Sequence, residues 1–473
     1  MNKMICMVAT LVSLTCATNA TAQSKRLQEK VKGFFLQSLT TQQKTLENDG
    51  REAFVRNHPT DTQLQTPIEG NNVANYQAMV WTAWCEANKG LQEEKLIAPD
   101  DLQQEKHSAW NLPTCLEPNA TMPYYYGRKG ASAENGATTK APLFLYLHGS
   151  GPKQTEWANG IKLGQRFQDA PSIYFIPQIP NEGEYYRWWQ LAKQYAWEKL
   201  IRQALASGEV DANRLYVFGI SEGGYGSQRL ASFYADYWAA AGPMAGGEPL
   251  KNAPVENCAN IGFSFLTGAD DRGFYRNQLT WYTQVAFDSL QLARPLSADK
   301  QPLFRHRIQL LPEMQHYVPY GLTTPWLKQF VRNPYPKTVL WEDYEMDGRH
   351  RSGFYNLQVL ERPSEARTFY EMNIDNNRVD INVSNVEYVT TQKDKQWGIE
   401  MKFNRNYTPA TGGKLRVYLN HELVNLNEPI TLTINGKQVF QGMAKPNLQA
   451  MVNSCAEYFD PCRIFPVAID AIY

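Results

Sequence analysis

The chain has 473 residues, which is enough for two or three domains, each with its own hydrophobic core. Lys and Arg together number 47, and so do Asp and Glu, so the formal net charge is +0. This balance argues against a nucleic-acid partner, whose phosphates require a basic surface. The aromatic residues are abundant, with 12 Trp, 26 Tyr and 20 Phe. Such an excess predicts that some of the rings line a binding surface.

Residues 1–22 have the pattern of a signal peptide. Lys3 provides a positive start, residues 4–17 are mostly apolar, and Ala-Thr-Ala at 20–22 is a small-x-small cleavage site. The apolar run is shorter than the ~20 residues of a membrane span, and no later sequence segment reaches that length. We therefore expect an exported protein, periplasmic or extracellular, without a transmembrane span. A lipoprotein signal at Cys16 fits less well, because the preceding residues depart from the usual Leu-small-small pattern.

Five cysteines would remain after cleavage, and export would permit disulfides. Cys455 and Cys462 are close in sequence within one loop-rich stretch, so they form the best candidate bridge. A Cys85–Cys115 pair is a weaker candidate. Because five is an odd number, at least one thiol stays free, most simply a buried Cys258.

The mature chain is expected to begin with a helical N-terminal segment over residues 23–118. Apolar residues recur at helical spacing from Leu27 to Leu39 and again from Tyr76 to Leu91. The sequence Asn-Leu-Pro at 111–113 breaks this pattern.

Residues 119–333 alternate between short apolar runs and helical segments. The strands are predicted over residues 141–147, 172–176, 215–218, 237–241, 261–266 and 307–311, and the helices over 195–206, 223–234, 274–292 and 324–331. Continuous apolar strands that alternate with helices are typical of an α/β fold, in which helices cover both faces of a mostly parallel sheet.

Residues 334–473 alternate between apolar and polar residues, as in Val379–Val383 and Lys414–Leu419. Thr431–Ile434 leads into Asn435-Gly436, which is the strongest short signal for a hairpin turn. This part is predicted to be a separate β-rich domain, an antiparallel arrangement resembling a β-sandwich.

Gly219-Ile220-Ser221-Glu222-Gly223 lies between a predicted strand and a predicted helix. Glycines on both sides of a serine permit a tight strand-turn-helix that exposes the hydroxyl above the sheet. The start of the helix also favours negative charge. The motif therefore predicts that Ser221 is a nucleophile, the alternative being a purely structural turn.

A serine hydroxyl needs a base, and the base needs an orienting acid. In this type of fold the acid and then the histidine follow the serine along the chain. His316 is the one histidine that follows the last predicted strand of the sheet and precedes the β-rich domain, which holds His350 and His421. Asp271 is the preferred acid, and Asp270 remains an alternative, because both follow the strand before it.

The negative charge that develops during acyl transfer requires two N–H donors. The backbone N–H of Glu222, directly after the serine, is expected to be one of them. The other is expected from Ser150 or Gly149, in the sequence His148-Gly149-Ser150-Gly151 that follows an early strand.

These motifs carry a family resemblance. Residues 120–332, with His-Gly-Ser-Gly, Gly-Ile-Ser-Glu-Gly-Gly-Tyr-Gly, Gly-Ala-Asp-Asp and His316, resemble the α/β-hydrolase superfamily, and in particular secreted feruloyl esterases and polyhydroxybutyrate depolymerases. Gly-x-Ser-x-Gly-Gly-Tyr is also similar to the catalytic domain of prolyl oligopeptidases, although the segment before it is too short for their propeller. The resemblance implies Ser/His/Asp acyl transfer without a cofactor.

Bulky residues follow the strand at 172–176, and ligands in open α/β sheets bind at the carboxyl ends of strands. Tyr186, Trp188 and Trp189 are therefore candidates for an aromatic wall around a sugar or phenolic group, the alternative being packing in the core. Trp157 is a similar candidate. Arg187 is a candidate partner for a substrate carboxylate.

Metal and nucleotide sites are not indicated. His421-Glu422 starts like a zinc-protease motif, but the second histidine is missing. The sequence thus predicts a secreted serine esterase that acts on acyl or aryl esters of polysaccharide. The alternatives are a serine peptidase for short peptides and a catalytically inert protein that binds glycan.

Overall fold

The computed structural model describes residues 24–45, 54, 64–65, 67–130 and 140–473. Within these residues, no helix is both long enough and apolar enough to cross a membrane. The expected signal peptide at 1–22 lies outside the described residues.

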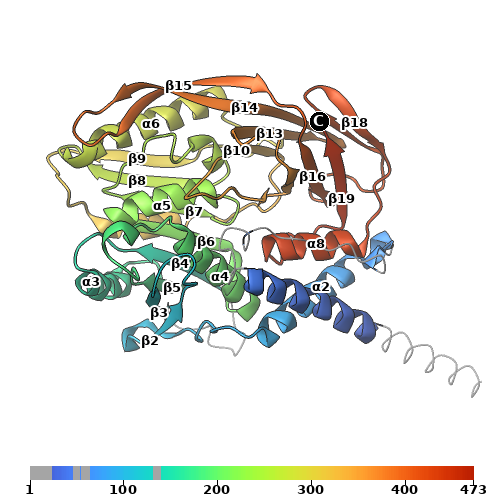
Figure 1. Ribbon diagram of the computed structural model, residues 1–473, viewed down its shortest axis with the longest axis horizontal. Coiled ribbons are helices and arrows are strands. Elements are labelled where there is room, and N and C mark those ends of the chain that lie inside the picture. The colour runs from blue at the N-terminus through green and yellow to red at the C-terminus, as the bar shows by residue number, and fades with distance from the viewer. Residues whose placement is uncertain (1–23, 46–53, 55–63, 66, 131–139) are drawn as a thin grey trace, which may run out of the picture.

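A nine-stranded sheet forms the centre of the region from residue 100 to residue 311 (Figure 1). Its strand order is β1-β3-β5-β4-β6-β7-β8-β9, with β2 paired to β3. The pairs from β5 through β9 are parallel, whereas β3 runs antiparallel to β5. The strands are β1 (Asp100–Asp101), β2 (His107–Asn111), β3 (Thr121–Lys129), β4 (Ala141–Leu147), β5 (Ser172–Pro177), β6 (Val210–Ile220), β7 (Ala240–Met244), β8 (Gly262–Gly268) and β9 (His306–Leu311). The mostly parallel sheet confirms the predicted α/β-hydrolase type of fold.

Helices cover both faces of this sheet, so alternate residues of one strand enter two different cores. Leu145 and Val217 belong to one hydrophobic cluster, and Phe144 and Phe218 belong to the other. The covering helices are α3 (Lys153–Arg166), α4 (Leu191–Ser207), α5 (Glu222–Phe233), α6 (Arg276–Ala293) and α7 (Thr323–Leu327). The last of these is shorter than predicted, and α3 was not predicted. Burial on both faces explains why the strands are continuous apolar runs.

The sheet begins earlier in the chain than the predicted boundary at residue 119. β2 pairs antiparallel with β3, in the register His107 to Tyr125. Trp110 of β2 is fully buried, and its ring lies 4.8 Å from Tyr124 and 5.4 Å from Phe175. The segment expected to be helical up to residue 118 therefore contributes strands to the sheet.

The C-terminal region contains two further sheets and one helix. One sheet has the order β10-β13-β14-β17-β18, with β15 on β14, and the other has the order β11-β12-β16-β19. All their pairs are antiparallel except β14 with β17. The elements are β10 (Thr338–Asp343), β11 (Gly353–Phe354), β12 (Leu357–Glu361), β13 (Arg367–Asp375), β14 (Arg378–Lys393), β15 (Glu400–Pro409), β16 (Lys414–Leu419), β17 (Ile430–Ile434), β18 (Lys437–Gly442), α8 (Leu448–Tyr458) and β19 (Val467–Ile472). Trp341 stacks on Phe354 and Tyr370, which joins the two sheets.

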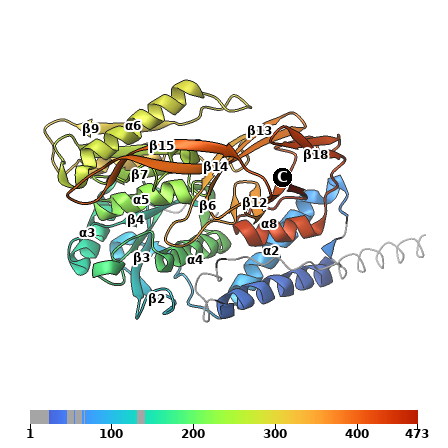
Figure 2. The same ribbon diagram turned by 45° about the horizontal axis from the view of Figure 1, so that its top comes forward.

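Helix α8 packs against α2 (Val73–Gly90), so segments near the two ends of the chain share one core (Figures 1 and 2). Val31 and Phe35 of the helix at 24–45 enter the same hydrophobic cluster. Trp84 of α2 stacks on Phe459, with ring centroids 5.8 Å apart. The N-terminal helices are therefore part of the C-terminal core.

The cysteines correct one expectation. Cys85, Cys115, Cys258, Cys455 and Cys462, which all lie in the described part of the chain, form no disulfide. Cys455 is buried in the cluster between α8 and α2, whereas Cys462 follows the end of α8 and contacts Asn213. The two sulfur atoms belong to different environments, so proximity in sequence was a poor guide to a bridge.

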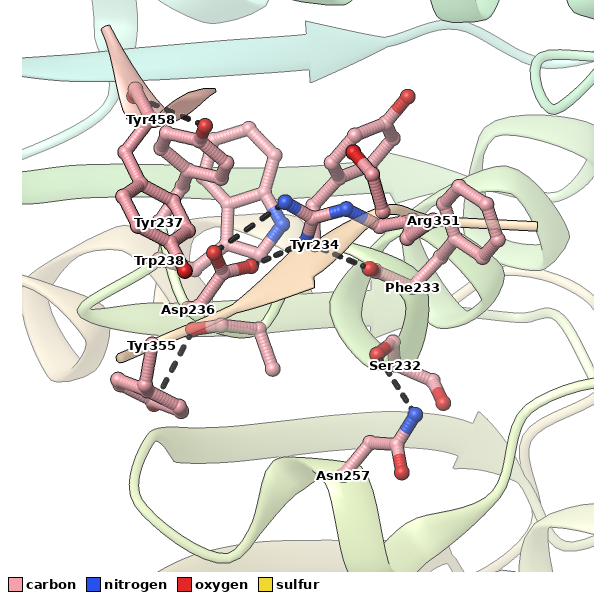
Figure 3. A network of polar contacts seen from close by, with 12 residues as sticks. Ser232, Phe233, Tyr234, Asp236, Tyr237, Trp238, Asn257, Arg351, Tyr355 and Tyr458 are labelled. Carbon is pink, nitrogen blue, oxygen red and sulfur yellow. Dashed lines mark hydrogen bonds and ion pairs between the residues drawn. The ribbon is translucent and has the colours of Figure 1, made fainter. Parts of the chain in front are cut away.

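A buried ionic network joins the catalytic sheet to the C-terminal region (Figure 3). Asp236, between α5 and β7, accepts hydrogen bonds from Arg351 and Arg463. Arg463 also bonds Asp460, with 2.9 Å between Nε and Oδ2, and Asp460 pairs with Arg332 at 2.7 Å. Burial opposes the charge of Asp236, but the two guanidinium groups outweigh it and hold its pKa below the ordinary value.

Candidate active site

Ser221 lies in a sharp turn between β6 and α5. Its backbone has φ 57° and ψ −114°, a conformation that is strained for any residue except glycine. A Cβ on Gly219 would lie 2.3 Å from the carbonyl oxygen of Gly223, and a Cβ on Gly223 would lie 1.9 Å from that of Leu147. The glycines are thus required for the backbone to crowd together and expose the Ser221 hydroxyl.

The structure brings Ser221, His316 and Asp271 into one hydrogen-bonded chain. The Nε2 atom of His316 is 3.0 Å from the Ser221 Oγ atom, and its Nδ1 atom is 2.8 Å from Asp271 Oδ2. A neutral imidazole with its proton on Nδ1 donates to Asp271 and accepts from the serine hydroxyl. The loops after β6, β8 and β9 supply these three residues. They meet because the carboxyl ends of parallel strands lie at the same edge of the sheet.

Asp271, rather than Asp270, lies against the histidine. Asp271 is buried, whereas the Asp270 side chain is half exposed and pairs with Arg272. Asp271 also receives two hydrogen bonds from Arg276, from Nε at 2.8 Å and from Nη2 at 2.6 Å. Burial raises the pKa of Asp271, but the bonds from His316 and Arg276 outweigh it and the net pKa is lowered. Arg276 was not predicted as part of the site, although it follows the acid by only five residues.

The loop after β4 approaches the nucleophile, as expected for an N–H donor. A Cβ on Gly149 would lie 3.5 Å from the Cβ of Ser221. Ser150 and Ser221 both line one pocket. Glu222 is the first residue of α5, where N–H groups lack acceptors within the helix. The candidate donors Glu222, Gly149 and Ser150 therefore surround the serine.

The side chains of His148 and Tyr186 hold this loop in place, a role that was not predicted from the sequence. The His148 ring bonds the Gly149 carbonyl at 2.7 Å and accepts from Ile179 N–H at 3.1 Å. Burial lowers the pKa of His148 to about 4, so the ring stays neutral and keeps both bonds. The Tyr186 hydroxyl donates to the Gly149 carbonyl at 2.7 Å, and it also contacts Gly151.

The expected aromatic wall is smaller than predicted. Trp188 is 0% exposed and donates from Nε1 to the His148 carbonyl. Tyr186 is buried beneath the loop that it holds, and Trp157 stacks on Tyr125 and donates to a strand carbonyl. The structure places these three in packing roles, because successive bulky residues point in different directions.

Only Trp189 and Arg187 from that group line the pocket beside Ser221, which has a volume of about 590 Å³. Arg229 lies over the Trp189 ring, 4.0 Å from its centroid, and pairs with Glu248 at 2.8 Å. Arg229 thereby holds the Trp189 ring at the pocket, and Glu248 neutralises the charge of Arg229.

Glu222 places an unusual carboxyl group in this pocket. The residue is 8% exposed, and its Oε1 atom is buried without a hydrogen-bond partner. The nearest cation is Arg187, whose Nη1 atom lies 3.5 Å from the carboxylate. Burial raises the pKa of Glu222 to about 7, against the opposing effect of Arg187.

The opposite side of the pocket comes from the C-terminal region. The β14–β15 hairpin contributes Lys393, Gly398, Ile399 and Glu400 to the pocket lining. Both strands extend over the catalytic region near α6 (Figures 1 and 2). We call these four residues the hairpin wall. It was not predicted as part of the site. The one available signal was the length of the two strands, which exceeds the typical length of about 5–6 residues.

The tip of the hairpin is docked on the turn that follows Asp271. The Tyr275 hydroxyl donates to Asp394 at 2.8 Å, and Phe274 meets Trp397 edge to face with centroids 4.7 Å apart. Lys251 pairs with Glu400 at 3.0 Å. The C-terminal region is thus in direct contact with the catalytic loops.

Comparison with solved structures finds weak likeness to esterases. A thermostable esterase has a TM-score of 0.37 and 19% identity over 49% of this chain, and the match covers 64% of that protein. A ferulic acid esterase has a TM-score of 0.34 and 14% identity, with 47% of this chain and 97% of that one covered. A CE1 ferulic acid esterase from Anaeromyces mucronatus has a TM-score of 0.32 and 11% identity, with 58% and 97% covered. These values are too low to assign an activity.

No protein-family model matches the sequence, and no curated protein matches it. Any conclusion about activity therefore depends on the geometry of the site.

Proposed function

We propose that the protein is a secreted serine esterase that hydrolyses acyl or aryl esters of polysaccharide. The observation that carries this proposal is the hydrogen-bonded chain from Ser221 through His316 to Asp271, of which Ser221 lines a pocket. The strained backbone at Ser221 adds support, because such strain clusters at functional sites.

The mechanism follows from the positions of these groups. The Ser221 oxygen attacks the ester carbonyl carbon while Nε2 of His316 takes the hydroxyl proton. The N–H groups of Glu222 and of Gly149 or Ser150 stabilise the oxyanion. The intermediate then releases the alcohol, which takes the proton from His316, and leaves an acyl-enzyme. Water repeats the same steps to release the acid.

The pocket suits an uncharged ring-bearing acyl group. Trp189 and the half-exposed Phe274 supply aromatic surface, and the Arg229 cation beside Trp189 is already paired with Glu248. The ring of an aryl ester would pack against Trp189 and Phe274.

An organophosphonate probe tests the proposal. The purified wild type should be labelled and should hydrolyse p-nitrophenyl acetate, whereas Ser221→Ala should show neither property. Ser364→Ala, in the C-terminal region, is the control and should behave as the wild type. A wild type that is neither labelled nor active would exclude the enzyme and leave glycan binding without catalysis as the remaining function.

A serine peptidase is the second candidate, favoured by the presence of Glu222 in the pocket lining. Its carboxyl group follows the nucleophile by one residue, where it would pair with the protonated amino terminus of a peptide. Turnover of dipeptide amides without turnover of acetyl or feruloyl esters would support this function instead.

Export belongs to the proposal because residues 1–22 have the pattern of a signal peptide. Cell fractionation should find the wild type in the periplasm or the medium. A chain that lacks residues 1–22 should remain in the cytoplasm.

A further inference from the structure

A second hollow lies farther along the β14–β15 hairpin. It has a volume of about 460 Å³ and lies between α6 and the two strands. Trp281 and Val285 come from α6, and Thr391, Phe403 and Asn404 come from the hairpin. We call this hollow the hairpin groove.

The groove combines exposed rings with small polar side chains. Trp281 is 50% exposed, and its ring lies 5.3 Å from that of Tyr282. Ser289, Thr391 and Asn404 add hydroxyl and amide groups to the same lining. A sugar ring has an apolar C–H face and a rim of hydroxyl groups, so this combination of surfaces fits a sugar ring.

The charged groups of the groove are largely engaged with other parts of the protein. Arg405 pairs with Glu256 at 2.6 Å. Lys402 lies over the Tyr282 ring, 5.5 Å from its centroid. The groove therefore offers neither a cluster of free cations nor a cluster of free anions to a ligand, which favours a neutral one.

The hairpin groove adjoins the catalytic pocket along two adjacent segments. Pro249 lines the pocket and Leu250 lines the groove, and in the hairpin Glu400 lines the pocket and Met401 lines the groove. Lys251 pairs with Glu400 of the pocket lining, and its Nζ atom lies 5.9 Å from the ring centroid of Phe403 in the groove lining, so it is close to both hollows. A ligand that extends past Lys251 would reach Ser221 with one part and Trp281 with another.

We propose that the hairpin groove binds the carbohydrate chain of the ester, as a neutral pyranose oligosaccharide, while the acyl group occupies the pocket at Ser221. This inference rests on the proposed esterase function for its second half only. Binding of sugar in the groove is a property that can be measured without turnover.

Calorimetric titration of the full mature chain with xylohexaose and with cellohexaose tests the binding. The two probes share the neutral pyranose chemistry and distinguish two sources of it. At least one of them should bind, and Trp281→Ala should weaken this binding about tenfold through loss of ring stacking. Tyr407→Ala removes a half-exposed ring of β15 that lies outside the groove lining, so it should change the affinity less than twofold.

Thr391→Trp provides a second variant, because it adds bulk to the groove from an exposed position of β14. It should weaken oligosaccharide binding as Trp281→Ala does. Both variants should keep the far-ultraviolet circular dichroism spectrum of the wild type and its rate on p-nitrophenyl acetate within twofold. On a feruloylated oligosaccharide, both should raise KM about tenfold and leave kcat unchanged.

The proposal is overturned if neither hexaose binds the wild type, or if both variants bind as well as the wild type. It is also overturned if sedimentation shows a dimer that Trp281→Ala dissociates, since the groove would then bind a second copy. If the hexaose binds in the groove but p-nitrophenyl acetate is not hydrolysed, the esterase function fails and the sugar site stands.

Discussion

The two sides of the catalytic pocket are built in different ways. On one side, which we call the sheet wall, Ser150, Arg187, Trp189, Ser221 and Glu222 come from loops of the parallel sheet. On the other side, the hairpin wall comes from a pair of strands far along the chain, and its tip is held by Tyr275 and Phe274. In the proposed mechanism the nucleophile belongs to the sheet wall, and the hairpin wall contributes none of the reacting groups. The hairpin wall can therefore shape the pocket without taking part in the chemistry.

The largest expected effect comes from removing the carboxylate that orients His316. Asp271→Asn should lower kcat for p-nitrophenyl acetate about 10⁴-fold, because the amide would favour the wrong tautomer of His316. The Asp270→Asn variant is the control and should lose less than about threefold, since Asp270 is half exposed and makes no bond to the histidine. Equal losses in both variants would contradict the assignment of the acid.

The next effect separates the region that carries the hairpin wall from the catalytic sheet. Asp236→Ala should lower the free energy of unfolding by about 3–5 kcal/mol, because Arg351 and Arg463 would be left as buried charges without this partner. Urea denaturation followed by circular dichroism measures this change. Asp288→Ala, at an exposed carboxylate, should change it by less than about 1 kcal/mol.

A smaller effect tests the buried carboxyl of the sheet wall. Burial raises the pKa of Glu222 from 4.5 to about 7, so the folded state binds its proton more tightly than the unfolded state. The stability from this proton is complete below pH 4.5 and is lost as the pH rises through 7. The loss amounts to about 3 kcal/mol.

Glu222→Gln should remove that part of the pH dependence. Unfolding free energies measured from pH 4.5 to 8 should fall less steeply in the variant than in the wild type. Identical slopes would show that the Glu222 carboxyl is ionised throughout.

The smallest effect concerns the hairpin wall. Trp397→Ala removes the ring that meets Phe274 and should loosen the tip. KM for a feruloyl ester should rise about threefold to tenfold, in line with an aromatic pair of about 1 kcal/mol, while kcat for p-nitrophenyl acetate stays unchanged. A fall in kcat on both substrates would mean that the two walls are not separate.

The sequence predicted the parts of the site whose signals are local. A strand, a tight glycine turn and a helix around Ser221 lie within a short segment, and the order of acid and histidine follows from the order of the strands. Trp188 misled the prediction, because aromatic residues in a run give no indication of which ring faces the core. The hairpin wall could not be predicted, since it depends on how two distant regions dock. Alternation in β14 and β15 specifies strands but not their neighbours.

The packing of α2 against α8 has a consequence for how the chain is made. The nine-stranded sheet and every C-terminal strand except β19 are translated between these helices, so Val31, Phe35 and Trp84 lack the apolar cover of α8 until that helix is made. Contacts between such distant segments form late, because a long loop must close before they are gained. During synthesis a nascent chain would thus expose an apolar helical surface. Chaperones bind surfaces of this kind.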